Sequence, residues 1–347
     1  MGFDHKETEA VNRVMKSGVL SEYQGNWSEN FYGGPEIQAL EKEWADHFQA
    51  NNAIACNSAT SGLWMALNAI GLEPDNEVIV SPYTMTCSAS LPLLFGAKPV
   101  FADIERDYFC IDPDDIIKKI TDNTRAIIAV DLFGQPCNYD RLKEICLRYG
   151  LKLIVDAAQA PGATYNGYHT TNWGDIGVYS LNRHKHIHCG EGGMVVTGSG
   201  VLARKLRLSM NHAEAVINDL EDKGNHFAFT DKMVGMNLRM TELSAAIARE
   251  QLKKLDTILD RHRNDARYFD VKVREGCEHS YYRYAWTNKT IGELISTTTD
   301  RWNYKRGYIK PIFQMPLFRN LDYDQKQCPV VQEVNEKIVL AWHRVAP

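Results

Sequence analysis

The stretch that decides the fold is YSLNRHKHIHCGEGG, residues 179–193. A strand-like apolar run, residues 176–180, leads into it, and a second run, residues 194–197, leaves it. Between the two runs lie one lysine, three histidines and a glycine-rich turn, which together are too polar for a core and too interrupted for a helix. We therefore expect a loop at the end of a strand, where functional groups are commonly placed.

The loop allows two chemical interpretations and one without chemistry. Lys185 can be a Schiff-base lysine, because neighbouring cations such as protonated His184 and His186 lower the pKa of an amine. Alternation along an extended segment instead puts three histidines on one side, which predicts a metal site with the ligands His184, His186, His188 and Cys189. The third interpretation is a solvated basic loop, and this stretch by itself favours it over either chemical one, because short motifs often match by chance.

The bulk composition is that of an ordinary soluble globular protein. The 347 residues are 44% hydrophobic and 24% charged, which predicts either one large domain with a smaller one or two domains. A net charge of -5 without a dense Lys/Arg block argues against binding to nucleic acid or to an anionic membrane. The N-terminal residues are polar, so we expect no signal peptide, and no run has the length of a membrane span. Eight cysteines without a Cys-x-x-Cys pair predict reduced thiols in a cytoplasmic protein.

Short apolar runs alternate with helical patterns over much of the chain. Strands are expected at residues 53–56, 77–81, 99–101, 125–130 and 151–155, with helices between them. This alternation predicts an α/β fold with three layers, in which helices cover both faces of a mostly parallel sheet and ligands bind beyond the carboxyl ends of the strands. We expect a large domain over residues 1–255, with an N-terminal arm at 1–34, and a smaller C-terminal α+β domain over 256–347.

Groups suited to one cofactor follow several of these strands. Ser58, Thr60 and Ser61 open the helix after the first strand, where hydroxyls and free N–H groups bind anions, although simple N-capping explains them too. Asp156 ends the fifth strand and can bind a protonated ring nitrogen or cap the next segment. Ser180 adds a further hydroxyl five residues before Lys185. A phosphate cradle, a carboxylate for a ring nitrogen and a reactive lysine together describe a pyridoxal-phosphate (PLP) site.

The order of these motifs resembles that of the DegT/DnrJ-type sugar aminotransferases, which have the aspartate-aminotransferase fold, fold type I. The motifs that carry the resemblance are NSATSGL at 57–63, SPYT at 81–84, GAKPVFAD at 96–103, DLFGQP at 131–136, DAAQA at 156–160, the run from Ser180 through Lys185 to GEGG at 190–193, and NLRMTE at 237–242. The resemblance covers about residues 8–260 and becomes vague beyond about 275.

The resemblance implies a role for each matching residue. Lys185 would form the Schiff base and move the proton, while Asp156 would keep the pyridine nitrogen protonated. Gln159 would lie near the phenolic oxygen of the cofactor. The phosphate would be bound by Ser58, Thr60, Ser61 and Ser180, and by Asn237 of the neighbouring subunit in a homodimer with shared active sites. Met85 stands where the family often stacks an aromatic residue on the ring, and a thioether is a softer contact.

The reaction implied is amino transfer, with glutamate as the expected donor, to a keto sugar that is usually nucleotide-linked, through PLP and pyridoxamine phosphate. Some relatives carry histidine in place of the lysine and dehydrate deoxysugars, so a PLP-dependent dehydratase is one alternative. A metal-binding protein built on His184, His186, His188 and Cys189 is the other. We favour the aminotransferase, with no metal, because Lys185 occupies the lysine position.

Overall fold

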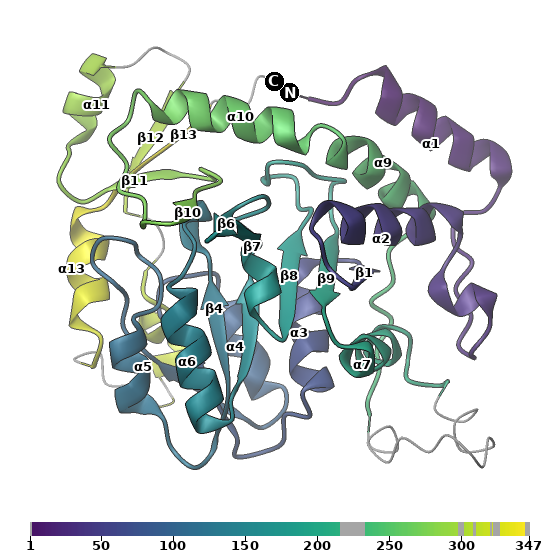
Figure 1. Cartoon of the computed structure of the whole chain (residues 1–347), viewed down its shortest axis with the longest axis horizontal. Coiled ribbons are helices and arrows are strands. Elements are labelled where there is room, and N and C mark those ends of the chain that lie inside the picture. The colour runs from purple at the N-terminus through teal and green to yellow at the C-terminus, as the bar shows by residue number, and fades with distance from the viewer. Residues whose placement is uncertain are drawn as a thin grey trace. The chain divides into compact units, whose positions relative to one another are not determined.

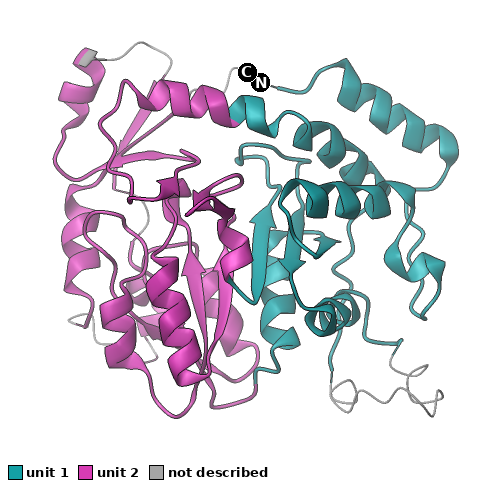
Figure 2. Ribbon diagram, viewed as in Figure 1, with its two compact units in different colours: residues 1–72, 174–258 teal, residues 73–173, 259–347 magenta. Residues whose placement is uncertain are grey.

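The computed structural model describes residues 2–215, 233–297, 302–307, 310–319, 321 and 327–343 (Figure 1). The chain divides into two compact units (Figure 2). Unit 1 comprises Met1–Leu72 and Gly174–Ile258, and unit 2 comprises Glu73–Trp173 and Leu259–Pro347. These units divide the chain differently from the expected domains of residues 1–255 and 256–347, and that domain boundary stays a prediction.

Unit 1 is built on three antiparallel strands. They are β1 (Asn52–Cys56), β9 (Gly193–Thr197) and β8 (Ile176–Ser180), in the order β1-β9-β8. Helix α3 (Ala59–Ala69) packs directly on them, because a Cβ at Gly62 would lie 2.8 Å from Val178 Cγ1 and 2.9 Å from Val195 Cγ2. Helix α7 (Gly200–Met210) follows β9, and α3 and α7 lie side by side. Only glycine fits at position 62 without moving the helix away from the strands.

The outer helices of unit 1 are joined by ion pairs of buried and half-buried side chains. They are α1 (His5–Ser17), α2 (Pro35–His47) and α9 (Glu242–Leu252), with the short η1 (Glu29–Tyr32) between α1 and α2. Arg249 on α9 binds Glu36 at 2.6 Å and Glu43 at 2.5 Å, both on α2. Lys254, just after α9, binds the buried Glu7 of α1 at 2.5 Å. Each charge has a partner of opposite sign, which offsets the cost of burying it.

Unit 2 contains four parallel strands in the order β5-β4-β2-β3. Their bounds are Lys152–Asp156 (β5), Thr124–Val130 (β4), Glu77–Val80 (β2) and Lys98–Phe101 (β3). In Figure 1, α5 (Pro113–Lys119) and α6 (Tyr139–Tyr149) lie in front of these strands and α4 (Cys87–Leu93) lies behind them. Strands covered on both faces must be apolar on both faces, as the sequence pattern indicated. The predicted α/β class with a mostly parallel sheet is confirmed.

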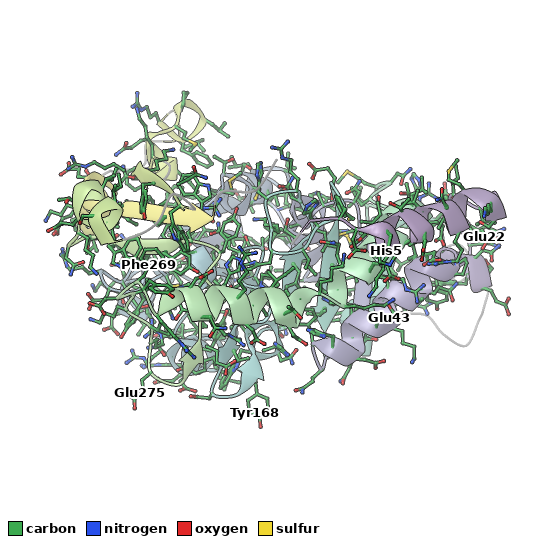
Figure 3. All side chains as sticks on the ribbon, turned by 90° about the horizontal axis from the view of Figure 1, so that it is seen from above. His5, Glu22, Glu43, Tyr168, Phe269 and Glu275 are labelled. Carbon is green, nitrogen blue, oxygen red and sulfur yellow. The ribbon has the colours of Figure 1, made fainter. Side chains whose placement is uncertain are left out.

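A smaller antiparallel sheet lies in the C-terminal part of unit 2. Its order is β11-β13-β12, with β11 at Tyr284–Trp286, β13 at Val339–His343 and β12 at Trp302–Arg306. Phe269, labelled in Figure 3, packs beneath it, with its ring 4.8 Å from that of Tyr284 and 4.6 Å from that of Trp302. The helices around it are α11 (Ile291–Thr297), α12 (Pro316–Arg319), α13 (Pro329–Lys337) and the short η5 (Ile312–Gln314).

Short elements complete unit 2. These are η2 (Leu132–Gly134), β6 (Thr164–Tyr165), β7 (Tyr168–His169), η3 (Thr170–Trp173) and β10 (Cys277–Glu278). Helix α10 (Leu255–Ala266) continues α9 after a break at Lys253 and Lys254 and leads from unit 1 into unit 2. Within the described ranges, no helix combines the length and the apolar character needed to cross a bilayer.

Candidate active site

The candidate groups of unit 1 lie at one edge of its strands, because the strand register aligns their ends. Cys56, the last residue of β1, pairs with Gly193, which in turn pairs with Ser180, the last residue of β8. The loops after β1 and after β8 therefore leave the strands side by side. We call residues 57–61 and 180–193 the unit 1 edge.

The first turn of α3 forms one part of the unit 1 edge. Ser58 is the N-cap, and its Oγ accepts a hydrogen bond from Ser61 N at 3.0 Å. The Oγ atoms of Ser58 and Ser61 are 2.9 Å apart, and Thr60 beside them is exposed. A Cβ on Gly193 would lie 2.5 Å from the backbone carbon of Ser58, so only glycine lets β9 start against this turn. The capping role of Ser58 is present, and the hydroxyls and N–H groups of the turn also suit an anion.

The loop that carries Lys185 forms the other part of the unit 1 edge. It folds back on itself through Leu181 N to Gly192 O at 2.9 Å and Arg183 N to Gly190 O at 2.9 Å. Lys185 N donates to Asn182 O at 2.9 Å, which places the half-buried lysine in a tight turn. Backbone bonds thus hold the lysine close to the end of β8, where Ser180 is 8% exposed.

The histidines of this loop do not form a metal site. In the part of the chain that the structure describes, which includes all four expected ligands, no group of three or more His, Cys, Asp or Glu could hold a metal ion. His188 lies against Phe3, with ring centroids 4.8 Å apart, and burial together with Arg183 and His184 lowers the pKa of its imidazole. Burial raises the pKa of the Cys189 thiol to about 12. Within the described residues, therefore, the structure does not gather the ligands that the metal-binding alternative requires.

In unit 2, Asp156 and Gln159 are buried at the carboxyl ends of β5 and β4. Asp156 is the last residue of β5, is 4% exposed, and pairs with Val130 at the end of β4. Its Oδ1 accepts from Ala158 N at 3.0 Å, so the predicted capping role is present as well. Gln159 is 3% exposed, and its Oε1 accepts from Phe133 N at 2.9 Å. We call the loops that follow the four parallel strands the unit 2 edge.

Two of the predicted cofactor-binding residues are more exposed than Asp156 and Gln159. Met85 follows β2 at the unit 2 edge and is 52% exposed. Asn237 is exposed in unit 1, and its Oδ1 accepts from Arg239 Nε at 2.9 Å. The next residue, Leu238, accepts a backbone hydrogen bond from Asn57 N at 2.8 Å in the same chain. Asn237 therefore lies beside the start of the α3 turn of its own chain, and its action on a neighbouring subunit stays a prediction.

Sequence reasoning missed two buried carboxylates. Glu242 Oε2 accepts from Glu36 N at 2.7 Å and so caps α2, whose own N-cap is Gly34 and lacks a side chain. Asp131 accepts from Tyr139 Oη at 2.7 Å and from Cys137 N at 2.9 Å, and burial raises its pKa to about 6. Both hold elements in place near the candidate groups, and both stand in motifs that the sequence had marked only as family signatures.

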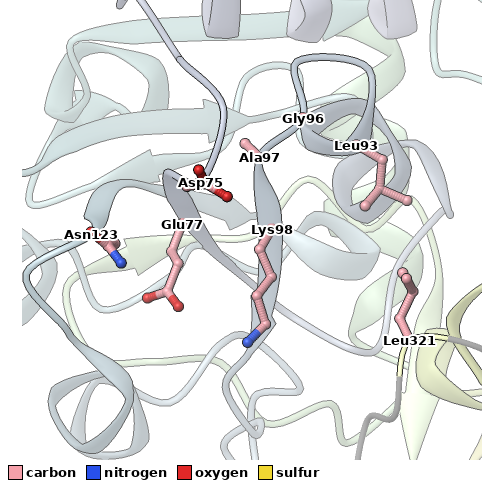
Figure 4. Close-up of a pocket in the computed structure, with 8 residues that line it drawn as sticks. All are labelled: Asp75, Glu77, Leu93, Gly96, Ala97, Lys98, Asn123 and Leu321. Carbon is pink, nitrogen blue, oxygen red and sulfur yellow. The ribbon is translucent and has the colours of Figure 1, made fainter.

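A depression of about 510 Å³ lies elsewhere in unit 2 (Figure 4). Glu77 and Lys98, the first residues of β2 and β3, line it together with Asn123, which precedes β4. It therefore opens at the amino ends of the parallel strands, opposite to the unit 2 edge, and it contains none of the predicted site residues. In parallel sheets ligands bind at the carboxyl ends, so this depression is not a candidate active site.

Comparison with known proteins identifies the class. Residues 4–344 match the DegT/DnrJ/EryC1/StrS aminotransferase family. The chain is 31% identical over 317 residues to the spore coat polysaccharide biosynthesis protein SpsC of Bacillus subtilis (86% of this chain, 78% of the relative). It is 35% identical over 277 residues to the GDP-perosamine synthase of Caulobacter vibrioides (77% and 72%). The solved aminotransferase of Psychrobacter cryohalolentis superposes with a TM-score of 0.84 at 27% identity (98% and 91%).

The chain belongs to the DegT/DnrJ/EryC1/StrS aminotransferase family. This confirms the resemblance seen in the sequence and the fold it implied. The family is a family of PLP-dependent enzymes, so the chain is an aminotransferase of that class.

Proposed function

We propose that this enzyme binds PLP, with Lys185 and Asp156 as its principal cofactor residues, and transfers an amino group from glutamate to a keto sugar. The observation that carries the proposal is that each predicted residue with a covalent or charged role ends a strand or follows one. Lys185 follows β8 and Asp156 ends β5. The sugar acceptor is supported by relatives named for sugar biosynthesis, among them a GDP-perosamine synthase.

The residues fit this cofactor. Hydroxyls and free N–H groups in the first turn of α3 match a phosphate, and the missing side chain of Gly193 leaves the backbone free to approach it. Asp156 is buried, so its carboxylate would interact strongly with a protonated ring nitrogen. When bound, PLP supplies an electron sink for the charge that develops on the substrate carbon. Lys185 Nζ provides the amine that attaches the cofactor and the base that moves the proton.

We assign the remaining contacts on the family resemblance. Gln159 would approach the phenolic oxygen, Met85 would cover one face of the ring, and Ser180 would add to the phosphate site. Asn237 would reach the phosphate of the neighbouring subunit in a homodimer. The donor is taken as glutamate, pyridoxamine phosphate as the aminated form of the cofactor, and the acceptor as a nucleotide-linked sugar. The cytoplasmic location inferred from the cysteines stays a prediction.

A PLP-dependent dehydratase is the second candidate, and Lys185 itself argues against it. In the dehydrating relatives a histidine stands at this position. Here His186 is only the neighbour, and Lys185 keeps the place that the lysine has in the aminotransferases.

Cofactor trapping followed by a substrate screen tests the proposal. The purified protein is loaded with PLP, reduced with borohydride and digested, and the modified peptide is identified by mass spectrometry. We expect one pyridoxyl group on Lys185, then amino transfer from glutamate to at least one keto sugar. Modification of other lysines alone, or elimination of water from a deoxysugar without amino transfer, would overturn the assignment.

A further inference from the structure

We propose that Arg283 binds an anionic group of a substrate, a carboxylate or a phosphate, at the unit 2 edge. The inference rests on the proposed function and adds a specificity residue to it. Its basis is an arginine without a carboxylate partner, in contact with two aromatic rings and fixed by its backbone to the loops that carry Gln159.

The segment that carries Arg283 interlocks with the unit 2 edge. Ser280 N donates to Gly134 O at 3.0 Å, and Arg283 N donates to Phe133 O at 3.1 Å. Ser280 Oγ also donates to Gln159 O at 3.2 Å. Gly134 has a φ of 99°, and a Cβ there would collide with Ser280 Oγ, so the two loops fit only with glycine at this position.

The same loops position Gln159, which ties Arg283 to the candidate site. Phe133 donates its N–H to Gln159 Oε1 at 2.9 Å and accepts from Arg283 N through its carbonyl. Gln159 lies three residues after Asp156, the last residue of β5. Phe133 therefore links the backbone of Arg283 to the side chain of Gln159, which is expected near the phenolic oxygen of the cofactor.

The guanidinium group of Arg283 is held in one orientation. Its central carbon lies 4.1 Å from the ring centroid of Tyr282 and 5.1 Å from that of Trp342. Trp342 reaches it because β11 pairs with β13 and brings Ala341 opposite Tyr284. Nη1 donates to Tyr282 O at 2.7 Å. Nη2 donates to Tyr282 Oη at 3.5 Å. A guanidinium has five N–H donors, so further N–H groups remain for a ligand.

Arg283 differs from two other stacked arginines, Arg207 and Arg274, in having no acidic partner. Arg207 stacks on Tyr32 but binds Glu41 at 2.7 Å, and Arg274 stacks on Tyr108 but binds Glu105. Among the residues that the structure describes, no carboxylate lies within 4.0 Å of the Arg283 nitrogens. A half-buried guanidinium binds a planar oxyanion through two parallel hydrogen bonds. We infer that the substrate supplies this anion.

Two sources could provide the anion: a carboxylate of the amino donor, or a phosphate or carboxylate of the sugar. Titration calorimetry on the PLP-loaded enzyme distinguishes these two sources by measuring the affinity for two probes. 2-Oxoglutarate represents the donor and inorganic phosphate represents the sugar, and neither probe reacts with the PLP-loaded enzyme. Loading with PLP first also fills the cofactor phosphate site, so that the added inorganic phosphate does not bind there.

The variants are Arg283→Gln, Arg283→Lys and the control Arg148→Gln. Arg148 also stacks on the neighbouring Tyr149, at 5.3 Å, but it precedes β5 and so lies at the other end of that strand from Asp156. We expect Arg283→Gln to weaken binding of one probe at least tenfold, Arg283→Lys to lie between it and wild type, and Arg148→Gln to change nothing. The KM for the matching substrate should rise more than kcat falls.

Weaker binding of 2-oxoglutarate to Arg283→Gln would show that Arg283 binds the carboxylate of the amino donor. Weaker binding of phosphate would show that Arg283 binds an anionic group of the sugar substrate. Unchanged affinity for both probes in Arg283→Gln and Arg283→Lys, with native melting temperatures, would overturn the inference. The proposed function would survive that result, since it fails only if wild-type protein does not take up PLP on Lys185 or transfers no amino group.

Discussion

The two edges carry different chemistry and differ in exposure. At the unit 1 edge, hydroxyls, backbone N–H groups and an amine remain partly open, with Thr60 exposed and Lys185 half-buried. At the unit 2 edge, Asp156 and Gln159 are only 4% and 3% exposed. A carboxylate that must hold a proton on a ring nitrogen acts more strongly away from water. An amine and a phosphate cradle instead have to admit their ligands.

The edges are also assembled by different means. The unit 1 edge follows from strand register, which aligns Cys56, Gly193 and Ser180. The unit 2 edge depends on a remote segment, because Ser280 and Arg283 bond to the loops after β4 and β5. Substitutions at the first edge should therefore act mainly on chemistry, and changes around the second should act on chemistry and on folding.

The largest effect is expected at Lys185. Replacing Lys185 with alanine removes both the attachment point and the base, so kcat should fall by about 10³-fold or more while the fold is kept. Single-turnover rates of the PLP-loaded variant measure this. The control is Lys98→Ala, because the exposed Lys98 starts β3 at the amino end of the sheet of unit 2. Near wild-type turnover in Lys185→Ala would refute the role given to the unit 1 edge.

Asp156→Ala should be the next most damaging change, and it tests the unit 2 edge. Losing a charge-assisted hydrogen bond worth about 1.5–3 kcal/mol should slow a single turnover about 10- to 100-fold. Asp140→Ala is the matched control, because Asp140 lies exposed in the first turn of α6 and accepts hydrogen bonds from Tyr165 Oη at 2.9 Å and Asn166 Nδ2 at 3.5 Å. Equal rates for the two variants would remove Asp156 from the mechanism.

Subunit mixing tests whether the unit 1 edge is completed by a second chain. Lys185→Ala and Asn237→Asp should each be inactive, the latter because a carboxylate repels phosphate. After subunit exchange, half of the dimers are mixed and each has one intact site, so activity should recover to about a quarter of wild type. Fluorescently labelled subunits verify the exchange. Verified exchange without recovered activity would mean that Asn237 acts in its own chain or not at all.

His279 should make unit 2 sensitive to acid. It is 4% exposed, its Nδ1 accepts from Tyr281 N at 2.7 Å, and burial lowers its pKa to about 3. The folded state keeps His279 neutral while the unfolded chain binds a proton below pH about 6.5. The stability that neutral His279 contributes is therefore fully present above pH 6.5 and is lost as the pH falls toward 3. By pH 5 the loss in the free energy of unfolding is about 2 kcal/mol.

His279→Asn keeps an acceptor for Tyr281 N and removes the titration. Urea unfolding at pH 7 and pH 5 should show a smaller loss of stability for the variant than for wild type. An identical loss in both proteins would assign the acid sensitivity to other groups.

The smallest effect concerns the cap of α2 in unit 1. Glu242→Ala removes the acceptor for Glu36 N and should lower the free energy of unfolding by about 1–2 kcal/mol. Glu242→Gln keeps an acceptor oxygen and should cost less. Chemical denaturation of the three proteins at pH 7 measures the difference, and a glutamine variant as unstable as the alanine variant would show that charge, not capping, matters here.

Much of the fold was predictable from the sequence because its signals are local. Apolar runs and helix starts marked β1 to β5 and α3 to α6 within a few residues. Thr241 immediately precedes a helical pattern, which predicts an N-cap there, and its Oγ1 accepts from Ser244 N at 3.3 Å. The candidate residues were found for the same reason, since strand ends and motifs are read from neighbours in the chain. The polar sequence of residues 211–235 predicts no particular element, and residues 216–232 within it lie outside the described residues.

Other features were decided only by the tertiary structure. Apolar periodicity predicts a long helix from about 241 to 275 with a possible break. The structure places that break at Lys253 and Lys254, between α9 and α10, and ends α10 at Ala266. The pattern at 303–315 predicts a strand region. The structure confirms a strand at its start, β12, and has the short helix η5 at Ile312–Gln314. Periodicity continues through such breaks, because it reports which residues are buried and not whether the backbone is continuous.

The partners of buried polar groups could not be read from the sequence either. Glu242 caps a helix 206 residues away in the chain, and Ser280 closes the loop of Gln159 across 121 residues. No local pattern encodes such pairs, since a side chain alone does not specify which distant donor it will meet. By itself the sequence determined which groups stand at the strand ends. The tertiary structure determined which of them are buried and what holds them, because burial and hydrogen bonding depend on how distant segments pack.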